Sequence, residues 1–125
     1  MKTQLSIEES ARLIELGVDA KQASEHHVGR WEHYSNGSYP DPDSVSPLFS
    51  LADLISILPK EIDGYHMSIE ASDEGYDVAY ILYDRNDGLL FLGAIPTDPE
   101  LIDSLNQLAI WCLTEKGINL NQEKQ

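Results

Sequence analysis

The chain has 125 residues, 42% of them hydrophobic, which fits one globular domain with a single core. Its 22 acidic and 8 basic residues give a formal net charge of −14, which argues against direct nucleic-acid binding because phosphate backbones bind clusters of lysine and arginine. The N-terminus lacks the apolar segment of a signal peptide, and no apolar run reaches the ~20 residues that cross a bilayer. The sequence therefore predicts a cytoplasmic protein that does not enter a membrane.

The hydrophobic pattern predicts an α+β domain in which an antiparallel β-meander of three to four strands packs with two or three helices, the last of them long. The expected elements are, in chain order, a helix at 6–17, a strand at 28–34, a loop at 35–47, a helix at 50–58, strands at 64–71, 76–83 and 89–95, a helix at 97–117 and a frayed tail at 118–125. Short connections between the last three strands favour antiparallel pairing of neighbours. Residues 1–125 are expected to form a single domain.

Each of the first two helices begins with a serine that is followed three positions later by an acidic residue. Ser6 with Glu9 matches a capping box, in which the hydroxyl and the carboxylate each accept a hydrogen bond from a free backbone N–H group. Ser50 with Asp53 resembles the same arrangement, and Pro59 is expected to end the second helix. The two helix starts are thus predicted from local chemistry alone.

Three strands are predicted in the second half of the chain. Residues 65–71 alternate apolar and polar side chains, which indicates one packed and one wet face. Residues 89–95 are apolar on both faces, which predicts a strand covered on both sides. The turn DRNDG at 84–88 is interpreted as a hairpin and not as a calcium loop, because its glycine comes one position too early for an EF-hand.

The C-terminal helix is predicted from an apolar stripe that includes Cys112. Thr97 is expected to cap it, with Glu100 completing a capping box, and Lys116 with Gly117 is expected to end it. Because this is the only cysteine, no intramolecular disulfide forms. Its place on the apolar stripe predicts a packed core thiol and not a nucleophile.

Residues 108–113 of this helix are apolar all the way round, and Trp111 falls off the main stripe. Two interpretations remain open. The helix is buried on two sides within the monomer, or Trp111 and Ile110 form part of a protein–protein surface, a homodimer included.

The stretch EHHVGRWEHY at 25–34 holds three of the four histidines. On a strand, His27 and His33 share a face but lie about 20 Å apart at ~3.3 Å per residue. On a helix, His26 and His33 lie roughly 10 Å apart. Neither geometry brings two imidazoles to one zinc ion, so no metal site is assigned. The stretch is interpreted as a strand with His27, Trp31 and His33 on one face, which is either partly buried or part of an interaction surface.

Three segments carry a family resemblance: LSIEESARLIELGVDAKQAS, FSLADLISILPKEIDGYHMSI and ELIDSLNQLAIWCLTEKGIN. They resemble a group of small proteins of unknown activity from gut Bacteroides-type bacteria and their phages or prophages. The LPKEI segment at 58–62 and the pair Trp111 and Cys112 carry most of this resemblance, and the segment LLFLGAIPTDP departs from it. The resemblance implies an α+β fold and a mobile-element context, without an activity, a cofactor or a catalytic residue.

No catalytic, cofactor-binding or metal-binding residue is assigned, no cofactor is expected, and whether the chain is an enzyme is left open. The favoured hypothesis is a non-enzymatic accessory protein of mobile-element or phage origin that binds another protein or forms a homodimer. One alternative is an acidic inhibitor that mimics DNA, with carboxylates arrayed along one face. A second is a ligand-binding domain or enzyme that uses His66 or the 25–34 histidines in a cleft.

Overall fold

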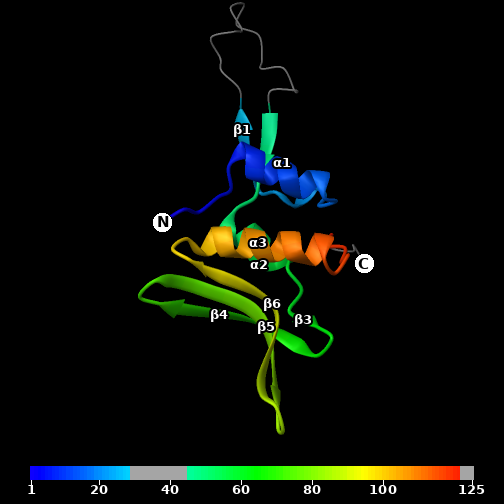
Figure 1. The fold of residues 1–125 in the computed structure, drawn as a ribbon. Coiled ribbons are helices and arrows are strands. Elements are labelled where there is room, and N and C mark those ends of the chain that lie inside the picture. The colour runs from blue at the N-terminus through cyan, green and yellow to red at the C-terminus, as the bar shows by residue number, and fades with distance from the viewer. Residues whose placement is uncertain (29–44, 122–125) are drawn as a thin grey trace, which may run out of the picture.

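Three α-helices and a four-stranded antiparallel sheet make up most of the computed structural model, which describes residues 1–28 and 45–121 (Figure 1). The helices are α1 (Ile7–Glu15), α2 (Leu51–Ile57) and α3 (Leu101–Thr114), with a short 3-10 helix at Ala20–Gln22. The sheet is a meander of β3 (Glu61–Ile62), β4 (Tyr65–Ser72), β5 (Gly75–Asp84) and β6 (Gly88–Asp98), and a separate pair joins β1 (Glu25–Val28) to β2 (Val45–Leu48). The predicted α+β meander with a C-terminal helix is confirmed.

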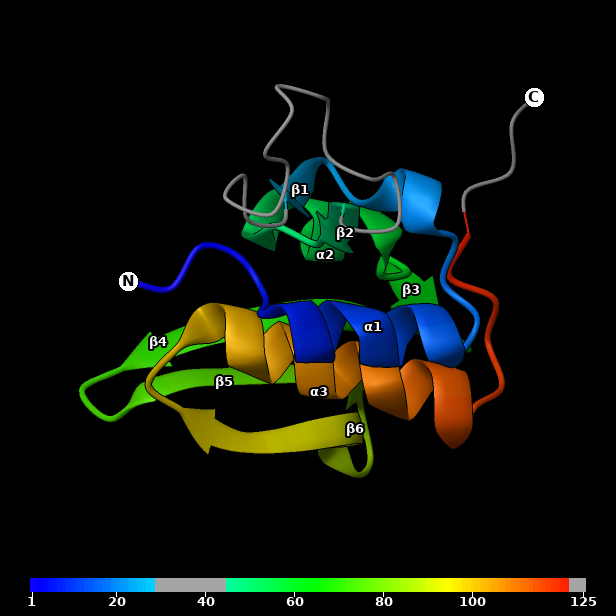
Figure 2. The same ribbon diagram turned by 90° about the horizontal axis from the view of Figure 1, so that it is seen from above.

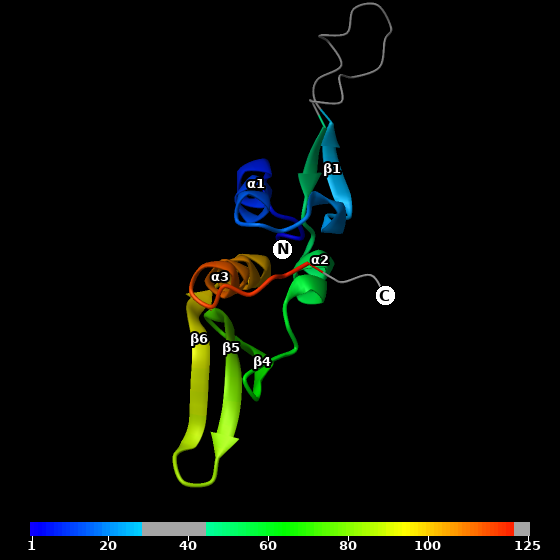
Figure 3. The same ribbon diagram turned by 90° about the vertical axis from the view of Figure 1, so that its right-hand side faces the viewer.

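The helices form a layer from which paired strands project at both ends. Helix α3 packs on one face of the sheet along β5 and β6, and α2 packs against α3 (Figures 1 and 2). The β5–β6 hairpin extends away from the helices, while β1 and β2 project at the opposite end (Figures 1 and 3). None of the helices in the described ranges has the length and apolar character needed to cross a membrane.

Both predicted capping boxes are present, and each helix begins at the residue after its serine. The N–H of Glu9 donates to Ser6 Oγ at 3.1 Å, and the N–H of Ser6 donates to Glu9 Oε1 at 2.9 Å. Asp53 and Ser50 make the same two bonds at 3.1 and 2.9 Å. These bonds satisfy N–H groups that have no partner inside a helix, which explains where α1 and α2 start.

The predicted start of the C-terminal helix was wrong. Helix α3 begins at Leu101, its N-cap residue Glu100 makes no side-chain cap, and Thr97 belongs to β6. The chain remains paired with β5 as far as Asp98, opposite Tyr76. The long-range ladder therefore overrides the local capping signal. The predicted end of the helix at 117 was also too late, since α3 ends at Thr114 with Glu115 as its C-cap, although Gly117 does have a positive φ of +62°.

Two further predicted boundaries need correction near the N-terminal hairpin. The strand begins at Glu25, before the predicted 28–34, and most of that prediction lies outside the described residues. Residues 45–47 were expected in a loop, but they belong to β2, where Pro47 is paired with His26. Pro47 has no backbone N–H group to donate. It is tolerated here because β2 is an edge strand, and residues whose N–H would point away from β1 need no partner strand.

The tail that was expected to fray is held in place as far as residue 121. Leu120 is 2% exposed in the core. The side-chain oxygen of Asn121 accepts a hydrogen bond from the backbone N–H of Asp19 at 2.6 Å, and its side-chain NH2 group donates to the carbonyl of Gly17 at 3.0 Å. The segment after α3 is therefore fastened to the segment after α1, and the prediction of fraying was wrong for residues 118–121.

The main core lies between α3, the N-terminal helices and one face of the sheet, which we call the inner face. Its fully buried side chains include Tyr80, Phe49, Leu54, Ile102, Leu105 and Leu108. The opposite face of β6 is open: Leu89 is 49% exposed and Phe91 is 59% exposed. The prediction that this strand is covered on both sides was wrong, because α3 covers only the inner face.

Candidate interaction surface

Trp111 packs against the sheet from α3. A Cβ atom built on Gly93 of β6 would lie 2.8 Å from the Trp111 ring, and the rings of Trp111 and Tyr80 are 6.3 Å apart between centroids. Ile110 is also partly buried against the core. This contact accounts for the place of Trp111 within the monomer, which was one of the two interpretations. A partner surface at Trp111 and Ile110 stays a prediction.

The other predicted surface residues are not brought together by the described structure. His27 lies in β1, with its Cα paired to that of Ser46. Trp31 and His33 lie outside the described residues. The predicted shared face of these three residues therefore stays a prediction.

Cys112 is a core residue with 0% exposure, beside the buried ring of Tyr80. Burial raises the pKa of the Cys112 thiol to about 11, although a hydrogen bond with Tyr80 opposes this rise. Burial likewise raises the pKa of Tyr80, whose hydroxyl donates to the carbonyl of Pro59 at 2.8 Å. A protonated and inaccessible thiol is a poor nucleophile, which agrees with the packed thiol expected from the sequence.

We expect Cys112 to react with a disulfide reagent such as Ellman's reagent at pH 8 at least about a hundredfold more slowly in the native chain than in urea. The reason is that the folded thiol is both buried and raised in pKa, so reaction needs an opening of the core. The absorbance of the released thiolate measures both rates. Equal rates in the two conditions would show that this thiol is accessible in the fold.

Residues on β4, β5 and β6 that alternate away from α3 form what we call the outer face. Its large side chains are His66, Glu70, Asp77, Ile81, Tyr83, Leu89 and Phe91. Register places Phe91 opposite Ile81 and Leu89 opposite Tyr83. Tyr83 is 75% exposed, so two apolar cross-strand pairs lie open on the projecting hairpin.

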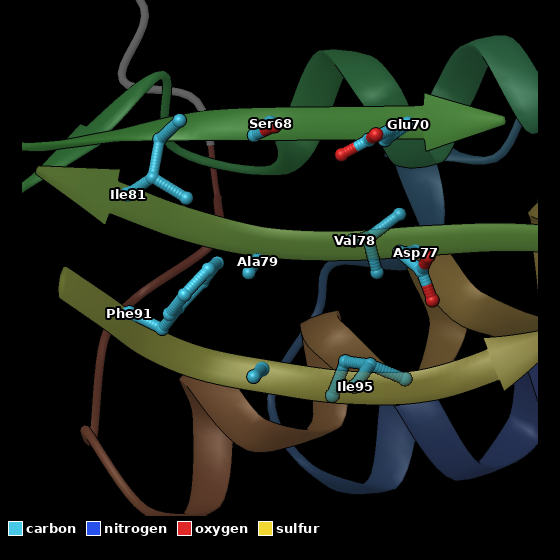
Figure 4. Close-up of a pocket in the computed structure, with 9 residues that line it drawn as sticks. Ser68, Glu70, Asp77, Val78, Ala79, Ile81, Phe91 and Ile95 are labelled. Carbon is cyan, nitrogen blue, oxygen red and sulfur yellow. The ribbon is translucent and has the colours of Figure 1, made fainter. Parts of the chain in front are cut away.

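A shallow hollow, which we call the outer groove, crosses this face (Figure 4). Its volume is about 340 Å³. The outer groove forms where small residues (Ser68, Ala79 and Ala94) lie between larger neighbours in its lining. Figure 4 shows Ile81 and Phe91 toward one end of it and Glu70 and Asp77 toward the other, with helices behind the strands. The groove thus joins an apolar end to an acidic end.

The acidic end of the outer groove is a like-charge pair. Glu70 and Asp77 are direct cross-strand partners, an arrangement that destabilises a sheet by itself. Asp77 accepts a hydrogen bond from the hydroxyl of Thr97. Within residues 1–28 and 45–121, the lysine and arginine ion pairs are made with carboxylates elsewhere. The charge of the Glu70–Asp77 pair is therefore left uncompensated by the described part of the chain.

The tip of the hairpin is an ordered turn, as predicted. Asp84 is paired with Gly88, and its Oδ1 accepts the N–H groups of Asn86 at 2.7 Å and Asp87 at 3.0 Å. These two backbone bonds lower the pKa of Asp84. They hold the ends of β5 and β6 in register and so fix the apolar pairs of the outer face beside each other.

Two other kinds of site would need a group of metal ligands or a histidine that lines a hollow. The described residues contain no group of three or more histidine, cysteine, aspartate or glutamate side chains that could hold a metal ion. His66 is exposed on β4, opposite Glu61 and Ile81. The outer groove has no histidine in its lining, and neither has a second hollow between the ends of α1 and α3.

The outer face is not predicted from the sequence, because an all-apolar strand is expected to be covered on both sides. Its signal was nevertheless present in the sequence. The two-residue turn between Ser72 and Gly75 sets the register that places Glu70 opposite Asp77. The all-apolar run at 89–95 indicated a strand with apolar side chains on both faces, of which a single helix can cover only one.

Comparison of the chain with protein families, curated proteins and solved structures finds no match.

Proposed function

We propose that this protein is a non-enzymatic accessory domain that binds another protein through the outer face of its sheet. The observation that carries the proposal is the exposure of Tyr83, Leu89 and Phe91 on a hairpin that projects from the helical layer. Exposed apolar clusters on small proteins mark interaction surfaces, and aromatic residues are enriched there.

The backbone of this surface supports binding at low entropic cost. The β5–β6 ladder pairs every residue from Tyr80 to Asp84 with a partner on β6, so the apolar side chains stand on a regular hairpin. A surface that is already ordered loses less conformational freedom when a partner docks.

The alternative that the acidic protein mimics DNA has less support than the proposed binding through the outer face. Several carboxylates are engaged inside the fold: Glu9 and Asp103 bind the Lys2 ammonium group at 2.8 Å, and Asp53 caps α2. Such carboxylates are oriented by their internal partners and are not free to form a row of phosphate-like spacing. Mobile-element origin remains part of the proposal and rests on the resemblance at 58–62 and Trp111. Neighbouring phage or prophage genes would support it.

We expect Phe91→Ser to abolish retention of a host protein on the immobilised chain, because it removes an exposed aromatic side chain from the centre of the apolar pairs. Stability should fall by under about 1 kcal/mol, since Phe91 is a surface residue with one apolar cross-strand neighbour. The measurement is affinity capture from host extract with quantitative mass spectrometry, beside a thermal unfolding curve.

Ile7→Ser on α1 is the matched control, because Ile7 is an apolar side chain with 39% exposure on a different part of the molecule. The control chain should retain the same protein as the wild type. A bound protein that is retained equally by wild type and Phe91→Ser would refute the outer face as the binding surface.

A further inference from the structure

We infer that the outer groove binds an extended segment of a different protein that carries a lysine or arginine with apolar residues two and four positions away from it. This inference rests on the proposed function and specifies the partner. The segment would set its cation against Glu70 and Asp77 and its apolar side chains against Ala79, Ile81 and Phe91.

Charge complementarity supports the cation. Glu70 and Asp77 face each other across β4 and β5, and no ion pair with a described lysine or arginine offsets their repulsion. A cation placed between them would remove a repulsion that the free protein tolerates. The whole chain has a formal net charge of −14, which would also speed the approach of a basic segment.

Strand geometry sets the spacing within the segment. Asp77, Ala79 and Ile81 follow one another on the same side of β5, and Asp77 and Ile81 are four residues, or about 13 Å, apart. An extended segment repeats its side chains on one face every two residues, about 6.6 Å. A cation at one position therefore matches apolar residues two and four positions away, the nearer of which enters the hollow left by Ala79.

A second copy of this chain fits the groove less well. Two chains of net charge −14 repel each other, and a face-to-face pair needs a cation opposite Glu70 and Asp77. The hairpin tip carries Arg85, but Asp84 and Asp87 flank it and leave the tip acidic. The occupant is therefore assigned to a partner of opposite charge.

The test uses a phage-displayed library of random twelve-residue peptides selected against the wild-type chain. The expected result is enrichment of a lysine or arginine with large apolar residues two and four positions away, in either direction. Synthetic peptides from the enriched set should then bind the Glu70→Gln, Asp77→Asn double variant about fivefold more weakly, with a smaller dependence on salt. The double variant retains side-chain oxygens for Thr97 and relieves the repulsion, so it should fold.

The Glu8→Gln, Glu115→Gln double variant changes the net charge equally at two exposed positions, one in α1 and one at the C-cap of α3, and should bind the peptides like the wild type. Enriched peptides without the cation, equal binding to both double variants, or no enrichment would overturn the inference. If Phe91→Ser still abolishes binding in those cases, the proposed function stands without it. A homodimer in sedimentation that Phe91→Ser dissociates would overturn the assignment to a different protein.

Discussion

Replacing Gly75 with alanine is expected to lower the free energy of unfolding by about 3 kcal/mol or more. Gly75 starts β5 with φ at +141°, a conformation that side chains seldom adopt. A Cβ atom there would lie 2.2 Å from the backbone oxygen of Asp98 and 2.9 Å from the nitrogen of Pro99. Both neighbours are backbone atoms at the end of β6, so relief requires the strands to separate. Urea denaturation followed by circular dichroism measures the loss.

Gly88→Ala is the matched control, because Gly88 also starts a strand after a hairpin turn and has φ at +78°. A Cβ atom on Gly88 meets nothing within 4 Å, so only the backbone conformation is penalised, by about 1–2 kcal/mol. Equal losses for the two variants would show that the contact with Asp98 does not limit stability. A Gly75→Ala chain that is already unfolded without urea would be the extreme form of the expected result.

The contact between Gly93 and Trp111 should appear as a large coupling in a double-mutant cycle. Gly93 has φ at +64°, and a Cβ atom there would lie 2.8 Å from two carbons of the Trp111 ring. We expect Gly93→Ala to cost about 2–4 kcal/mol in the wild type, from backbone strain and overpacking together. In the Trp111→Leu background the steric part disappears, and the same change should cost only about 1–2 kcal/mol.

The unfolding free energies of the wild type, the two single variants and the double variant give this coupling directly. Trp111→Leu alone should also destabilise the chain, because it removes a partly buried ring that packs beside Tyr80. Additive losses would contradict the packing of Trp111 onto Gly93. Such a result would favour the alternative interpretation, in which Trp111 forms part of a protein–protein surface.

The features that were predicted correctly depend on residues close together in the chain. The capping pairs Ser6 with Glu9 and Ser50 with Asp53 act within one helical turn, so their chemistry is readable without the fold. The strands at 65–71 and 76–83 are recognised by side-chain type and alternation, and short turns make them neighbours. The place of Cys112 in the core follows from its position on an apolar helical stripe.

The features that were missed depend on contacts between distant segments. Thr97 has the sequence context of a helix cap, but pairing with β5 keeps it in a strand. Residues 118–125 were expected to form a frayed tail, but Leu120 is buried in the core and the side chain of Asn121 is hydrogen-bonded to Gly17 and Asp19. In each case the energy of tertiary pairing exceeds a local preference of about 1 kcal/mol.

The sequence by itself determined the class of the fold, the two capped helices and the meander, because periodicity and caps act over a few residues. Only the tertiary structure decided which face of each strand is covered, because coverage depends on where α3 lies across the sheet. An apolar run such as 89–95 is compatible with burial on one face or on both. The placement of α3 on the inner face alone leaves Phe91 and Leu89 exposed, and with them the surface that we propose for binding.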